Sequence, residues 1–153
     1  MKKPLNEGSC QRTRVKSAKT QSPWVRWSRR VQHQRALSLR QPRAWLVVNG
    51  YKDVENRSWR TNHRGPLLIH ASASRSLTNS DNLAVIEKKY HVHLPRDFDL
   101  GGIVGVVNVI DCVRTHSSKW KMRRTWGWVL RNPRRLSFRP CKGFVGLFRP
   151  KIR

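Results

Sequence analysis

The stretch that decides the fold is residues 102–113, GIVGVVNVIDCV. Valine and isoleucine fall on both of its alternating faces, and β-branched residues of this kind favour the extended conformation. A strand that is apolar on both faces has to be covered on both faces. The stretch therefore predicts the central strand of a closed or covered sheet.

Shorter elements precede this strand. Residues 36–39 and 66–70 are apolar runs of strand length, and residues 51–59 have the pattern of a turn and a strand. A helix is predicted over residues 42–49, because Pro42 suits a first helical turn and Gly50 can adopt the left-handed conformation that often follows a helix. A second helix is expected over residues 80–90, with Ser80 as its N-cap.

Further strands are expected after the central one, at residues 126–130, 136–138 and 143–147. About six mostly short strands and two or three short helices predict an α+β fold. We expect a small, mostly antiparallel β-barrel whose ends are closed by helices. A chain of 153 residues has the usual size of one such domain.

Positive charge is the main compositional feature, with a net charge of +25. Residues 1–34 carry +8 and lack a hydrophobic period, which predicts a basic, disordered extension. This extension could be a transit peptide, an arm that binds nucleic acid, or a product of translation from a start codon upstream of the true one. Residues 35–153, the predicted domain, still carry +17, and such an excess points first to a nucleic acid partner.

Several classes of protein are disfavoured. The chain lacks an apolar run that could span a bilayer and the apolar part of a secretory signal, so we expect a cytoplasmic protein without membrane contact. Its three cysteines have neither disulfide nor zinc-site spacing, and His91 and His93 lack a third ligand at useful spacing. We expect no metal, no cofactor and a monomeric state.

Five runs of the sequence resemble the ASCH domain of bacterial and phage proteins. The resemblance covers about 115 residues, with the runs in the family order: ALSLRQPRAWLVVNGYKDVENRSWRT, HRGPLLIHAS, GGIVGVVNVIDCV, WGWVLRNPRRL and PCKGFVGLFRP. It implies a β-barrel of the PUA-like fold, which is related to domains that bind modified or structured RNA. It also implies a ligand cleft at one end of the barrel.

The resemblance places a G-x-K-x-x-E-x-R signature in that cleft, present here as Gly50, Lys52, Glu55 and Arg57. A carboxylate can accept from the amino groups of a base, and arginine and lysine suit phosphate or carbonyl groups. Neighbours are expected at the same mouth, among them aromatic side chains that could stack on a base. These additional predicted ligand-binding residues are Ser38, Gln41, Trp59, Arg64 and Trp126.

Simpler interpretations compete with this one. Glu55 and Arg57 could form only an ion pair on a strand, Lys52 could be a solvated loop lysine, and His70 is expected to be a satisfied core histidine. Arg43 replaces the tryptophan that usually follows the proline in this family and adds charge near the mouth.

The residues leave open whether the domain is an enzyme. Some ASCH proteins remove the acyl group from acetylated cytidine, and others are reported to cut RNA. In the amidohydrolases a threonine nucleophile follows the lysine by three residues, where this chain has Glu55. Glu55 with Lys52 could still act as a general base and a charge stabiliser in a hydrolase. We favour an RNA-binding or nucleotide-binding module that recognises a base.

Overall fold

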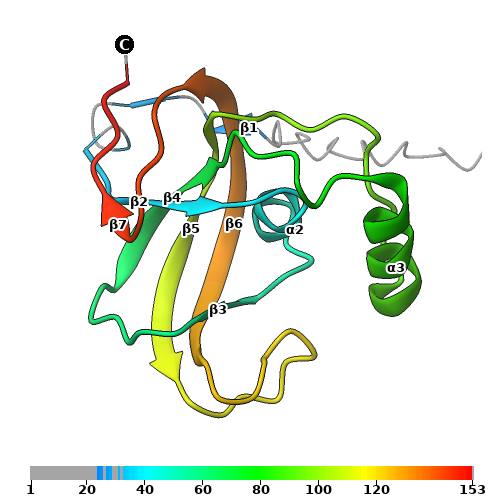
Figure 1. Cartoon of the computed structure of the whole chain (residues 1–153). Coiled ribbons are helices and arrows are strands. Elements are labelled where there is room, and N and C mark those ends of the chain that lie inside the picture. Colours follow the sequence, from blue (N-terminus) through cyan, green and yellow to red (C-terminus); the bar gives the residue numbers. More distant parts are fainter. Residues whose placement is uncertain (1–23, 26, 29–30, 32, 153) are drawn as a thin grey trace, which may run out of the picture.

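The computed structural model describes residues 24–25, 27–28, 31 and 33–152 (Figure 1). Within these residues the chain forms one curled sheet with two helices, in the following order along the chain: β1 (Trp24–Val25), β2 (Ala36–Leu39), α2 (Arg43–Val48), β3 (Val54–Arg57), β4 (Gly65–Ala71), α3 (Ser80–Tyr90), β5 (Gly102–Val113), β6 (Trp126–Pro140) and β7 (Leu147–Phe148). The predicted α+β class and the mostly antiparallel, barrel-like sheet are confirmed.

The sheet is built around the antiparallel ladder of β5 and β6, the two longest strands. Its strand order is β1-β6-β5-β4-β2-β7, and β3 pairs with the first residues of β6. Only the β1 and β6 pair and the β2 and β4 pair are parallel among the described strands. The ladder thus joins the N-terminal and C-terminal halves of the domain.

The main hydrophobic core lies inside the curl of the sheet, against α2. Val47 and Val48 of α2 are buried there, and the apolar residues of β4 and β5 pack around them. Gly105 lets the helix approach the sheet, because a Cβ at this position would lie 2.5 Å from Val48 Cγ1. The apolar character of both faces of β5 is explained by this covering, as the sequence predicted.

Strand β6 differs from its prediction as two separate strands. It runs without a break from Trp126 to Pro140, although Asn132 has a positive φ of 51° and Pro133 cannot donate a backbone hydrogen bond. The register moves from Asn108↔Arg131 to Val106↔Arg134, so β6 contains one more residue here than β5. The Asn-Pro pair therefore forms a bulge within one strand rather than a loop between two.

Other boundaries also differ. The cap of α3 is Asn79 and not Ser80, because the helix begins at Ser80 and the Asn79 side chain accepts a hydrogen bond from Asn82 N. The last strand is Leu147–Phe148 rather than residues 143–147, since residues 141–144 follow a loop against β4. The predicted left-handed residue after α2 is confirmed, because Gly50 has a φ of 81°.

Part of the predicted N-terminal extension contacts the domain. Trp24–Val25 pairs with Arg135 and Leu136 of β6, and Trp27 Nε1 donates a hydrogen bond to Ser137 O at 2.8 Å. Trp27 also packs against a second hydrophobic cluster, because burial of its apolar ring is favourable. This cluster consists of Ala36, Leu68, Ile103, Val106 and Leu136. Residues 1–23 lie outside the described residues, and the division of the chain at residue 34 stays a prediction.

The two helices are short. In the described part of the chain, neither helix is long and apolar enough to cross a membrane. Helix α3 has no fully buried residue, and it attaches to the domain through partly buried Ile86 and Tyr90. These two side chains pack on a third cluster around Trp120, which forms one wall of the pocket described next.

Candidate functional site

A cavity of about 420 Å³ lies between the end of α2, the strand β3 and the helix α3. We call it the Lys52 pocket. Its walls combine buried charged groups with aromatic and aliphatic side chains: Arg43, Leu46, Lys52, Glu55, Asn56, Arg57, Ser58, Ile86, Tyr90, Trp120, Met122, Arg124 and Thr125. Three of the four signature residues predicted from the sequence therefore line one pocket, and the fourth, Gly50, forms the turn that leads into it.

The turn after α2 positions the lysine. Gly50 adopts its left-handed conformation directly after the helix, and the backbone amides of Tyr51 and Lys52 both donate to Leu46 O. The chain then enters β3, which pairs with β6 in the register Glu55↔Trp128. These backbone hydrogen bonds fix the end of α2 relative to the start of β3, and they thereby fix the distance between Lys52 and Glu55.

Lys52, Glu55 and Arg57 form a largely buried network of charges. Lys52 Nζ lies 2.8 Å from Glu55 Oε2 and also donates to Val54 O, and the two side chains are each only 5% exposed. The Arg57 guanidinium donates through Nη2 to Ser38 O at 2.9 Å. One carboxylate thus faces two cations, which leaves an excess of one positive charge in a setting where charges are costly to bury.

One atom of this network lacks a hydrogen-bond partner. Arg57 Nε is buried and lies 3.6 Å from Glu55 Oε1, too far for a hydrogen bond. The carboxylate still balances the charge of the guanidinium, because the two atoms lie within ion-pair distance.

An aromatic stack forms the opposite wall. The rings of Tyr90 and Trp120 lie 3.6 Å apart and 15° from parallel, and Trp120 Nε1 donates to Tyr51 O at 2.6 Å. Lys52 Nζ lies 5.8 Å from the centre of a Trp120 ring. The Asn56 amide holds the segment that carries Trp120 by bonds to Trp120 O and Met122 N.

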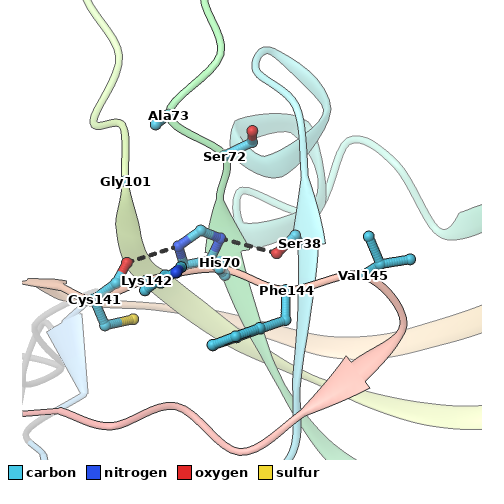
Figure 2. A pocket seen from close by; sticks show the side chains of 10 residues that line it. Ser38, His70, Ser72, Ala73, Gly101, Cys141, Lys142, Phe144 and Val145 are labelled. Carbon is cyan, nitrogen blue, oxygen red and sulfur yellow. Dashed lines mark hydrogen bonds between the residues drawn. The ribbon is translucent and has the colours of Figure 1, made fainter.

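Ser38 and Gln41 are not brought to this pocket by their side chains. The Ser38 hydroxyl lies 3.1 Å from His70 Nδ1 and lines a different cavity of about 430 Å³, here called the Ser38 pocket (Figure 2). Only the backbone carbonyl of Ser38 contacts Arg57. The Gln41 amide bonds within the protein, because it accepts from Trp45 N and donates to Asp99 O, both at 3.0 Å.

His70 in the Ser38 pocket is a neutral, structural histidine. It is 2% exposed, and its Nε2 faces the carbonyl oxygen of Cys141 at 3.1 Å (Figure 2). A carbonyl can only accept, so we assign the proton to Nε2 and make Nδ1 the acceptor for the Ser38 hydroxyl. Burial lowers the pKa of His70, partly opposed by the bond to Cys141 O. The prediction of a satisfied core histidine is confirmed.

Trp59 and Arg64 line a third cavity of about 540 Å³, here called the Trp59 pocket, together with Arg35, Arg60, Thr61, Asn62, His63 and Leu147. Trp126 lies beside it, with the Arg114 guanidinium 4.2 Å and the Arg60 guanidinium 5.7 Å from the centre of an indole ring. The single mouth expected from the sequence is therefore divided among several pockets, and the binding roles of these residues stay predictions.

The family model of the ASCH domain matches residues 37–137, about two thirds of the chain, from β2 into β6. The chain belongs to the ASCH domain family. Its assignment to the bacterial and phage type stays a prediction. ASCH domains have a PUA-like fold, a fold of RNA-binding domains.

Among curated proteins, the chain is similar to "Activating signal cointegrator 1" of Homo sapiens and of Mus musculus. Each is 39% identical over 83 residues, which is 50% of this chain. The aligned part is only 14% of the length of either relative. The likeness therefore concerns the ASCH domain and not the remainder of those proteins.

Sequence reasoning missed the aromatic stack of the Lys52 pocket. Tyr90 is only the last residue of the helix predicted over residues 80–90, and Trp120 lies outside every predicted element. They stack although they are 30 residues apart, and no local pattern connects them. The signal that was available is the unusual basic and aromatic content of residues 119–124, three of which, Trp120, Met122 and Arg124, line the pocket. Arg43 lines the pocket, as its position after Pro42 predicted.

Proposed function

We propose that this ASCH domain binds RNA and holds one base in the Lys52 pocket. The observation that carries the proposal is the charge network of the pocket, in which the Glu55 carboxylate faces both Lys52 and Arg57 while the Arg57 side chain remains 25% exposed. A base carbonyl or ring nitrogen could accept from the exposed part of the Arg57 guanidinium, and Glu55 could accept from an exocyclic amino group.

The shape of the pocket agrees with a flat, partly apolar ligand. Its volume of about 420 Å³ lies in the range of small-molecule sites, which are typically about 300–1,000 Å³. The Tyr90 and Trp120 stack, with Met122, supplies an apolar wall, and the charged network supplies a few polar groups. Bases are recognised by this combination in many proteins that bind single-stranded RNA.

Charge favours RNA over an isolated nucleoside. Arg43 and Arg124 are exposed at the rim of the pocket, and residues 35–153 together carry +17. A nucleoside without phosphate gains little from these cations, whereas each phosphate of an RNA strand can pair with one. We therefore favour a polymeric ligand.

The same geometry favours recognition over hydrolysis. Glu55 Oε2 is bound by Lys52, and the residue at the position of the threonine nucleophile of amidohydrolase members is this glutamate. Binding requires no further group, so it is the function that the site supports best.

The test is a binding measurement on the full chain. Fluorescence anisotropy with a labelled single-stranded RNA of mixed sequence should give an affinity that falls as salt rises. The Arg57→Gln variant should bind roughly 10- to 100-fold more weakly, because hydrogen bonds to charged groups contribute about 1.5–3 kcal/mol each.

The matched control is Arg75→Gln, which removes the same charge from an exposed position in the loop between β4 and α3. It should bind RNA as the unmodified chain does. Equal loss in both variants would show that only net charge matters and would contradict the proposal. Release of acetate from acetylated cytidine, or cleavage of the RNA, abolished by Glu55→Gln would replace binding with hydrolysis.

A further inference from the structure

The Trp59 pocket is a second cavity with the composition of a nucleic-acid site. It is lined by three arginines, Arg35, Arg60 and Arg64, and by the indole of Trp59. The single carboxylate that contacts these arginines in the described part of the chain is Asp111, which lies 3.2 Å from Arg64 Nη2. An excess of positive charge suits a phosphate, and an exposed aromatic ring beside it suits a base.

The aromatic groups of this region are held in place. Trp59 is 37% exposed, and its ring meets the buried Trp128 ring edge to face at 4.7 Å. Trp126 carries two guanidiniums on its indole, those of Arg114 at 4.2 Å and Arg60 at 5.7 Å. Contacts of this type orient the arginines without neutralising them, so their charge remains available to an anion.

Arg64 is fixed by the backbone. Its Nη1 donates to Thr61 O at 3.1 Å and to His63 O at 3.0 Å, and its side chain remains 41% exposed. The loop before β4 thus presents a guanidinium whose position is set before any ligand arrives. Pre-set donors lose less entropy when they bind an anion.

The two pockets are adjacent along the chain. Arg57 and Ser58 line the Lys52 pocket, and the next two residues, Trp59 and Arg60, line the Trp59 pocket. Three residues of chain span at most roughly 10–11 Å. A strand of a few nucleotides is long enough to cover both pockets.

We infer that the Trp59 pocket is a second nucleotide subsite, so that the ligand is a single RNA strand whose neighbouring nucleotides occupy the two pockets in turn. The inference rests on the proposed function and deepens it, because it names the ligand as a single strand of at least two nucleotides. In this arrangement a base stacks on Trp59, and Arg60 and Arg64 contact the phosphates beside it.

A length series tests the inference. Binding of a nucleoside monophosphate and of a single-stranded RNA hexamer of the same base is measured by calorimetry with the full chain. The Arg60→Gln variant should bind the hexamer about 5- to 10-fold more weakly and the monophosphate as before, since only the hexamer reaches the second subsite. Trp59→Leu should show the same difference between the two ligands.

Arg57→Gln and Arg75→Gln complete the design. Arg57→Gln should weaken both ligands, and Arg75→Gln neither. Hexamer binding that is equal in Arg60→Gln, Trp59→Leu and Arg75→Gln would overturn the second subsite while the effect of Arg57→Gln upheld the first. An unchanged affinity in Arg57→Gln would instead overturn the proposed function. Hexamer binding that an acidic peptide displaces as well as unlabelled RNA would assign the Trp59 pocket to a protein partner and overturn the inference.

Discussion

The Lys52 pocket and the Trp59 pocket are neighbours, yet they hold their charges in opposite ways. In the first, Lys52 and Glu55 are 5% exposed and are set by a helix end and a paired strand. In the second, Arg64 and Asp111 are 41% and 55% exposed and lie on a loop and a strand end. Buried charges are strongly coupled and geometrically strict, whereas exposed charges are screened and tolerant. We therefore propose that polar groups select a base in the first pocket, whereas the second pocket attracts phosphates and stacks a base without selecting it.

The largest effect is expected on the stability of the protein when the carboxylate of each pocket's ion pair is removed. Glu55→Ala should lower the free energy of unfolding by about 3–5 kcal/mol, because it leaves the buried Lys52 cation, and the partly buried Arg57 beside it, without their carboxylate. Asp111→Ala, in the exposed pair, should lower it by less than about 1 kcal/mol. Urea denaturation followed by circular dichroism measures both, and similar losses in the two variants would erase the contrast.

A charge-preserving substitution should separate the pockets in RNA binding. Arg57→Lys should weaken binding of the hexamer about tenfold, because lysine cannot reproduce the planar set of donors at Nε and Nη2. Arg60→Lys should change the affinity by no more than about threefold, since a phosphate accepts either cation. Anisotropy titrations at one salt concentration compare them. A larger loss for Arg60→Lys would reverse the assigned roles.

Much of this arrangement was predictable, because it is local in sequence. The strands at residues 36–39 and 102–113 agree with their predicted bounds, since neither apolar run has a competing helical pattern. The G-x-K-x-x-E-x-R spacing places Lys52 three residues before Glu55, within reach across the start of one strand. The family model matches residues 37–137, which is most of the region of the family resemblance.

The remainder depended on pairing that the sequence does not show. Ser38 faces His70 because β2 pairs in parallel with β4 in the register Ser38↔His70, a contact over 32 residues. Its side chain therefore points away from Arg57, although its carbonyl contacts that arginine. Asn132-Pro133 has the local signal of a turn, and only the long ladder with β5 keeps it within one strand.

The smallest expected effect concerns how stability depends on pH. It arises in the Ser38 pocket, which contains the neutral His70, whereas the Lys52 pocket contains charged groups. Burial lowers the pKa of His70 below its ordinary value of 6.5, so the unfolded chain binds a proton more readily than the folded one. The contribution of neutral His70 to the free energy of unfolding is complete above pH 6.5 and is lost as pH falls through the lowered pKa. His70→Gln should flatten this part of the stability curve, measured by urea denaturation from pH 8 to 5.

If the free energy of unfolding of His70→Gln declined below pH 6.5 as much as that of the unmodified chain, another group would be responsible. RNA binding between pH 7 and 8 should not depend on this histidine, because it faces the Ser38 pocket and contacts neither of the proposed subsites.

Photo-cross-linking tests the central claim most directly. The full chain is bound to a short single-stranded RNA that contains 4-thiouridine, irradiated, digested and mapped by mass spectrometry. A base held in the Lys52 pocket predicts adducts on Tyr90, Trp120 or Met122, the side chains of its apolar wall. Adducts confined to the Ser38 pocket, at residues 141–145, or to residues 1–34 would contradict it.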